Sequence, residues 1–353
     1  MISSGRPVAL AVGLIACIFF PLMHSAQAAR RLPSYRIVKT IPLGGPDKWD
    51  FLYFDSSTGR VYVSHRSKVD IVDPAEGKVV GEIAPIGESH GVAAIPKLGR
   101  IYADDAKNND LITADAKTLA KIATAKVGLD ADAVVADPRS ARVYVMGGDG
   151  HSVTAIDAAN NRTLKIVPLD GSPEFAVLDG KGKLFINIAS TNEIAVFDTK
   201  KLAVTARWST APCRKPHGMA MDTQTDRLIV SCGNARMIVA DAANGKIVAN
   251  FAIGKGSDAA VFDPETKLAF SSNEDGTLSV IAERGPDKFV SLGSIKTAPG
   301  ARTMALDPKT GRIFLVTADV TKTEPSRKPG HGPEFIFAPN SVKLLVLTPA
   351  RPH

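Results

Sequence analysis

The strongest constraint on the fold is a sequence segment that recurs seven times along the chain. Each copy begins with an ionisable residue, passes through a short apolar strand and a polar turn, and ends in a second apolar strand. The copies begin at Asp50, His90, Asp132, Glu174, His217, Asp258 and Arg302. Successive copies begin 40 to 44 residues apart. This period is typical of the blades of a β-propeller.

A second pair of alternating strands follows the first pair in each repeat, as in the segments that begin at Lys68, His151 and Glu193. Four strands per repeat predict an all-β fold, a seven-bladed β-propeller with four-stranded blades. The seventh repeat has three strands, at about 303–307, 312–317 and 342–347, and lacks an outer strand. We therefore expect the N-terminal strand, Tyr35 to Leu43, to complete the last blade and leave no open sheet edge.

Recurrent aspartates have an architectural explanation, because an Asp that opens a turn accepts backbone N–H bonds. The first strand of a repeat ends in such an Asp at 55, 137, 179, 222, 263 and 307, and the third strand at 73, 115, 157, 198 and 241. We expect these eleven carboxylates to stabilise turns and to take no part in a functional site.

The N-terminal residues differ in character from the repeats. Arg6 precedes an apolar run from Val8 to Met23, and Ala26-Gln27-Ala28 has the small-x-small form of a signal peptidase site. The apolar run of about 16 residues is short for a membrane span of about 20. We therefore expect residues 1–28 to be a signal peptide that is cleaved near Ala28. Residues 29–353 are then expected to form a single propeller domain that is periplasmic or secreted. A retained membrane anchor and a lipoprotein box ending at Cys17 are the alternatives.

The remaining cysteines, Cys213 and Cys232, flank the innermost strand of the fifth blade and the strand after it. Both therefore lie at the same face of the propeller. Because an exported protein meets an oxidising compartment, we expect a disulfide between them. Two free buried thiols, or a Cys–His–Cys metal site with His217, are the alternatives.

Several segments resemble a known family. Asn187-IASTNEIAVFDT and Val143-YVMGGDGHSVTAIDA resemble the YVTN repeat of secreted seven-bladed propellers. Ala211-PCRKPHGMAMD, Ile253-GKGSDAAVFDPETKLAFSSNEDGTLSV and Gly300-ARTMALDPKTGRIF are similar to the YncE-like family of exported bacterial propellers. The resemblance extends over the repeats but is poor in a long blade-7 loop at about 317–341. It implies an exported propeller and carries no catalytic residue over to this chain.

The residues that open the seven repeats are expected to meet in a ring at the mouth of the central channel. They comprise four carboxylates, two imidazoles and one guanidinium, and Trp49 adds an apolar face beside Asp50. Imidazoles with carboxylates suit zinc, manganese or iron, so a divalent metal ion is one candidate cofactor, and the sequence does not identify the cofactor. The predicted metal ligands are His90, His217, Asp132 and Glu174. Arg302 could bind a carboxylate or phosphate.

The function predicted from the sequence is that of an exported binding protein. It would hold a small-molecule ligand, a metal ion or an envelope protein at this ring, as a monomer without a membrane span. The alternative is a metal-assisted hydrolase, lactonase or lyase in which His90, His217 and Glu174 act in catalysis. The net charge of +7 is spread along the chain and only 6% of residues are aromatic, so nucleic-acid binding is not expected.

Overall fold

The computed structural model describes residues 1–2, 31–45, 48–326 and 332–350. The predicted signal peptide, apart from its first two residues, lies outside this part of the chain. Residues 31–353 form one compact unit. Its described residues are strands and turns with one short 3-10 helix, η1 (Pro96–Leu98). None of the helices in the described part of the chain has the length and apolar character needed to cross a membrane.

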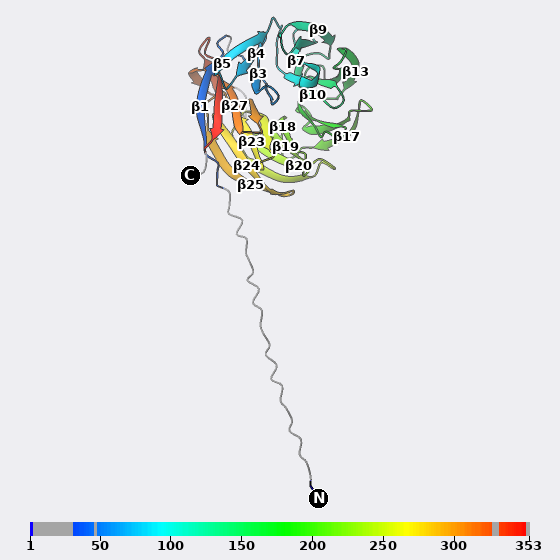
Figure 1. Cartoon of the computed structure of the whole chain (residues 1–353), viewed down its shortest axis with the longest axis vertical. Coiled ribbons are helices and arrows are strands. Elements are labelled where there is room, and N and C mark those ends of the chain that lie inside the picture. Colours follow the sequence, from blue (N-terminus) through cyan, green and yellow to red (C-terminus); the bar gives the residue numbers. More distant parts are fainter. Residues whose placement is uncertain (3–30, 46–47, 327–331, 351–353) are drawn as a thin grey trace. The chain divides into compact units, whose positions relative to one another are not determined.

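Seven four-stranded antiparallel sheets are arranged in a ring (Figure 1), so the predicted seven-bladed propeller is confirmed. Blades 1 to 6 each consist of four consecutive strands. Blade 1 consists of β2 (Leu52–Asp55), β3 (Arg60–His65), β4 (Lys68–Asp73) and β5 (Lys78–Ile83). Blade 2 consists of β6 (Val92–Ile95), β7 (Arg100–Asp105), β8 (Asp110–Asp115) and β9 (Lys121–Lys126). Blade 3 consists of β10 (Ala131–Asp137), β11 (Arg142–Gly147), β12 (Ser152–Asp157) and β13 (Arg162–Pro168).

The next three blades have the same order of strands, with the first strand innermost. Blade 4 consists of β14 (Pro173–Leu178), β15 (Lys183–Ile188), β16 (Glu193–Asp198) and β17 (Ala203–Ser209). Blade 5 consists of β18 (Pro216–Asp222), β19 (Arg227–Cys232), β20 (Arg236–Asp241) and β21 (Ile247–Ala252). Blade 6 consists of β22 (Ser257–Asp263), β23 (Leu268–Asn273), β24 (Thr277–Gly285) and β25 (Lys288–Lys296).

Blade 7 joins the two ends of the chain. Its strands are β26 (Met304–Asp307), β27 (Arg312–Thr317), β30 (Lys343–Pro349) and β1 (Tyr35–Pro42). In Figure 1, β1 is the blue strand that lies beside the red C-terminal strand. The two strands are antiparallel, with Tyr35 opposite Pro349 and Pro42 opposite Lys343. The predicted closure by the N-terminal strand is therefore confirmed.

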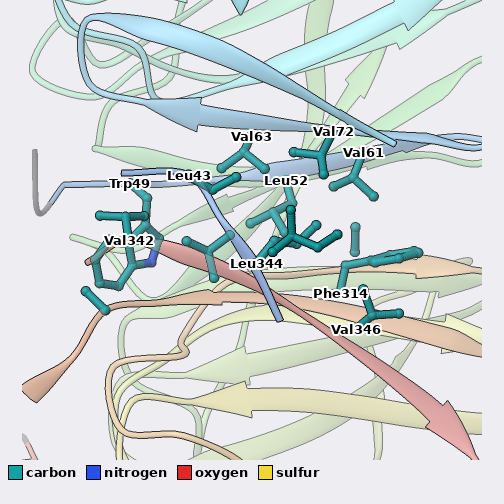
Figure 2. Close-up of a cluster of buried hydrophobic side chains, with 14 residues drawn as sticks. Leu43, Trp49, Leu52, Val61, Val63, Val72, Phe314, Val342, Leu344 and Val346 are labelled. Atoms are coloured by element: carbon teal, nitrogen blue, oxygen red, sulfur yellow. The ribbon is translucent and has the colours of Figure 1, made fainter. Parts of the chain in front are cut away.

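The core consists of apolar side chains packed between neighbouring sheets. One buried cluster combines Ile41 of β1, Leu344 of β30 and Phe314 of β27 with Leu52 and Val61 of blade 1. Figure 2 shows side chains of blades 1 and 7 meeting in this cluster. The closing strand thus contributes both its backbone to blade 7 and its side chains to the contact between the last blade and the first.

The turn aspartates act as the sequence predicted. The Asp55 carboxylate accepts the Ser57 N–H at 2.9 Å and the Tyr62 hydroxyl at 3.0 Å. Asp137 likewise accepts the Arg139 N–H at 3.0 Å. These hydrogen bonds satisfy turn donors that the strands leave unpaired.

Between β27 and β30 the chain forms an additional hairpin. Its strands are β28 (Val320–Glu324) and β29 (Glu334–Phe337), which pair antiparallel with Val320 opposite Phe337. Phe337 contacts Trp49 edge to face, with ring centroids 5.2 Å apart. The base of this hairpin is therefore packed against the segment that leads into blade 1.

Cys213 and Cys232 form a disulfide, as predicted, with their Cα atoms 5.6 Å apart. Both residues are buried in the core between blades 4 and 5. The bond joins the segment before β18 to the end of β19, and His217 lies within the loop that it closes.

We predict that the double variant Cys213→Ala/Cys232→Ala unfolds more easily than the native protein. A crosslink over a sequence separation of 19 removes chain entropy from the unfolded state and stabilises by about 3 kcal/mol. Urea denaturation of the variant and of the native protein under non-reducing conditions measures the difference. Two titratable thiols in the denatured, unreduced native protein would contradict the pairing.

A second prediction concerns ring closure. A variant lacking residues 1–44 loses β1 and leaves the edge of β30 unpaired, so we expect it to aggregate or to melt at a much lower temperature. The matched control lacks residues 1–30 only and keeps β1. Light scattering and thermal melts compare the two. Equal stability and a monomeric state for both would show that closure does not depend on β1.

Candidate functional site

The seven residues that open the repeats line one cavity. It measures about 290 Å³ and is lined by these seven residues together with Phe51 and Asp130. We call the seven the ring residues and this space the ring cavity. Six of the seven side chains expose 20 to 28% of their surface, and Arg302 exposes 38%. They are thus partly buried and still open to the cavity.

Local backbone geometry turns these side chains inward. In blades 3 to 6 the ring residue lies where the pairing between the first two strands shifts register, as at Ala131/Val134 around Asp132 and Pro216/Met219 around His217. A bulge of this kind bends a strand and redirects a side chain. In blades 1, 2 and 7 the ring residue instead lies two positions before the innermost strand begins.

Buried polar side chains fix the backbone of the ring. The Asp104 carboxylate accepts the N–H groups of His90 and Gly91, both at 2.8 Å. The Asn187 side-chain amide donates to the His217 carbonyl at 2.8 Å, and the Ser272 hydroxyl donates to the Arg302 carbonyl at 2.5 Å.

Asp104, Asn187 and Ser272 each occupy the penultimate position of a second strand that is otherwise largely apolar. The sequence analysis did not identify these positioning residues. The signal that could have found them is a polar residue at that place in the repeat.

The first group of ring residues consists of Asp50, His90 and Asp132. His90 Nδ1 lies 2.9 Å from Asp50 Oδ2 and 3.9 Å from Asp132 Oδ1. Burial alone would lower the pKa of His90, but the hydrogen bond to Asp50 and the charges of Asp50, Asp104 and Asp132 outweigh it and raise this pKa to about 9. The imidazole is therefore a cation held between carboxylates near neutral pH.

The second group consists of Glu174, His217, Asp258 and Arg302. His217 Nδ1 lies 3.4 Å from Glu174 Oε2 and 3.7 Å from Asp258 Oδ1. Arg302 Nε lies 2.6 Å from Asp258 Oδ2. Burial alone would lower the pKa of His217, but Glu174 and Asp258 raise it above its ordinary value. This group is therefore largely neutralised by its own ion pairs.

Two carboxyl groups of the cavity, those of Asp132 and Asp258, ionise less readily than an ordinary Asp. Burial, reinforced by the charges of Asp50 and Glu174, raises the pKa of Asp132 well above its usual range, although His90 opposes the shift. Burial also raises the pKa of Asp258 despite the nearby Arg302 and His217. Part of each shift comes from repulsion by Asp50 and Glu174, and a cation placed in the cavity would relieve this repulsion.

Three of the ring residues meet the spacing that a metal ion requires. Asp50, His90 and Asp132 each offer one ligand atom, and these atoms lie within 4.8 Å of one another. Of the four metal ligands predicted from the sequence, the structure brings His90 and Asp132 together in this cluster with Asp50. His217 and Glu174 belong to the second group.

Two further pockets adjoin the ring and share Glu274 and Arg302 in their walls. Trp49 lines the first, of about 230 Å³, together with Phe337 of the additional hairpin, and is not among the residues that line the ring cavity. Glu334 of the hairpin lines the second, of about 440 Å³. Burial raises the pKa of Glu274 although Arg302 opposes the shift. Sequence analysis missed Glu274 because it does not begin a repeat.

Comparisons with known proteins agree on the fold. No known family profile and no curated protein matches the sequence. A chain in the crystal structure of the Mitotic Checkpoint Complex aligns with a TM-score of 0.71 at 13% identity, covering 89% of this chain and 96% of that one. A chain of Kuenenia stuttgartiensis hydrazine synthase aligns with a TM-score of 0.66 at 14% identity, covering 87% of this chain and 99% of that one. At such identities the likeness shows the propeller fold alone.

We predict a pH-dependent contribution of His217 to stability. Because its folded-state pKa lies above the ordinary value of 6.5, its ion pairs stabilise the fold fully below pH 6.5 and lose this effect as the pH rises through the folded-state value. The free energy of unfolding of His217→Asn should therefore fall furthest below that of the native protein under mildly acidic conditions. Denaturation of both proteins in chelator, from about pH 5.5 to about pH 9.5, measures this. A difference that is constant with pH would contradict it.

Proposed function

We propose that this protein is an exported binding propeller that holds a small, positively charged ligand in the ring cavity. The observation that carries this proposal is the convergence of ionisable side chains from all seven blades on one cavity with an excess of carboxylates. Concave sites with convergent polar groups are the usual places for ligand binding.

The charge balance of the cavity indicates the sign of the ligand. Its walls include five carboxylates, at 50, 130, 132, 174 and 258, against the guanidinium of Arg302 and two imidazoles. Arg302 Nε lies 2.6 Å from Asp258 Oδ2, so the charge of this guanidinium is partly neutralised within the ring. A cation would gain from the surplus of negative charge, and an anion would be repelled.

Three observations support export. The N-terminal residues carry the n-region, apolar run and small-x-small site of a signal peptide. The Cys213–Cys232 disulfide is compatible with an oxidising compartment. The repeats resemble those of the exported YncE-like propellers, and we infer membership of that family from the resemblance. An envelope protein with a basic segment would be a further ligand of the same charge.

A second candidate function is that of a metal-assisted hydrolase, lactonase or lyase. The specific observation in its favour is that Asp50, His90 and Asp132 together supply only three ligands, which leaves positions for water and substrate on a bound ion. His217 and Glu174 line the same cavity and could transfer a proton.

We predict that a panel of small cations and anions separates these ligand classes. Diamines, quaternary ammonium compounds and divalent cations should raise the melting temperature, whereas dicarboxylates and phosphate should not, because the cavity is acidic. Glu174→Gln should weaken the response to cations several-fold, since it removes one of the five carboxylates.

The matched control is Asp137→Ala, which removes a carboxylate that accepts hydrogen bonds in a turn and does not line the ring cavity. It should lower stability by about 1 kcal/mol and leave cation binding unchanged. Binding of anions in preference to cations, or a response to cations that Glu174→Gln does not alter, would contradict the proposed function.

A further inference from the structure

We propose that Asp50, His90 and Asp132 bind a single divalent transition-metal ion at the wall of the ring cavity. The inference rests on the proposed function and names the ligand class of one part of that site. The three residues come from blades 1, 2 and 3, which are consecutive around the ring.

The distances suit a metal ion with little rearrangement. Two ligand atoms that are each about 2.1 Å from a tetrahedral ion lie about 3.4 Å apart. His90 Nδ1 lies 2.9 Å from Asp50 Oδ2 and 3.9 Å from Asp132 Oδ1. These two distances differ from the required one by about half an ångström, and all three ligand atoms lie within 4.8 Å of one another.

The electrostatic surroundings favour a cation at this point. The Asp132 carboxylate accepts no hydrogen bond from any residue in the described part of the chain, and its closest positive partner is the imidazole 3.9 Å away. Asp104, which accepts the His90 N–H, is fully buried, and its Oδ2 has no hydrogen-bond partner among the described residues. Two ligating carboxylates and one buried carboxyl group therefore surround the place where the ion would bind, and the ion would replace the proton on His90 Nδ1, which is released to solvent.

The cluster is also held in position before binding. Asp104 fixes the His90 and Gly91 backbone through two hydrogen bonds of 2.8 Å, and the Thr303 hydroxyl donates to the Asp50 carbonyl at 2.9 Å. Outer groups of this kind orient the ligands of metal sites and affect affinity strongly.

The second group of ring residues is electrostatically less favourable for a cation. Its Asp258 carboxylate is paired with Arg302, and a guanidinium so close repels a cation. The mixed nitrogen and oxygen ligands of the first group also select the kind of ion, because magnesium and calcium prefer oxygen ligands alone, whereas zinc, manganese and iron accept imidazole.

The experiment is isothermal titration calorimetry of the purified, chelator-treated protein with Zn²⁺ and with Mn²⁺, supported by electron paramagnetic resonance of bound Mn²⁺. We expect one ion per chain. His90→Ala and Asp132→Asn should each weaken binding at least about tenfold, since even changes to outer groups act on this scale. The control is His151→Asn, which removes an exposed histidine outside the cavity, at a position of positive φ that Asn tolerates. It should bind the ion as the native protein does.

The outcomes distinguish the inference from the proposed function. Native-like thermal melts establish that the variants are folded. The inference would be overturned if the native protein bound neither Zn²⁺ nor Mn²⁺, or if it bound Mg²⁺ and Ca²⁺ as tightly as these ions. It would also be overturned if both variants lost less than about tenfold in affinity. If the protein binds organic cations but no transition ion, the metal site is wrong and the proposed function stands. If it binds no cation of any kind, both fail.

Discussion

The antiparallel pairing of β1 with β30 is the contact on which the rest of the structure depends. A propeller blade cannot bury both faces of its sheet alone, and stability comes from packing each blade between two neighbours. The pairing of the chain ends completes blade 7 where it packs against blade 1. Here β1 supplies the outer strand of blade 7, while Ile41 packs against residues of blades 1 and 7. A closed ring then fixes the positions of all seven innermost strands.

This closure brings together residues that are far apart in the chain. Asp50 and Arg302 lie more than 250 residues apart, yet both line the ring cavity. The repeat supplies one ionisable side chain per blade, and bulges or strand starts turn each of them inward. Polar residues in the second strands, such as Asp104 and Asn187, then fix the backbone behind them. The cavity is thus a product of the repeat and of specific departures from it.

Much of the fold could be predicted from the sequence because it follows from local periodicity. Strand alternation, the 40 to 44 residue spacing and the turn aspartates predicted the blades, and the missing outer strand of the last repeat predicted the role of β1. The placement of Cys213 and Cys232 on one face, together with predicted export, favoured a disulfide over free thiols or a metal site, and the structure contains the disulfide.

The details of the site could not be predicted in the same way. Division of the ring residues into two groups depends on side-chain torsions and on distances between blades, such as the 2.6 Å contact between Arg302 and Asp258. Glu274 and the hairpin of β28 and β29 belong to no repeat, so periodicity gave no indication that they line neighbouring pockets. The repeat therefore predicted which residues meet in the cavity, and the structure shows how they pair.

The central claim is that Asp50, His90 and Asp132 bind a divalent transition-metal ion, so that the ring cavity is more than a hydrated opening. The most direct test is anomalous X-ray diffraction from crystals of the protein grown with Mn²⁺. The account predicts an anomalous peak in the ring cavity, about 2 Å from side-chain atoms of Asp50, His90 and Asp132. A well-ordered cavity that contains only water under saturating Mn²⁺ would contradict it.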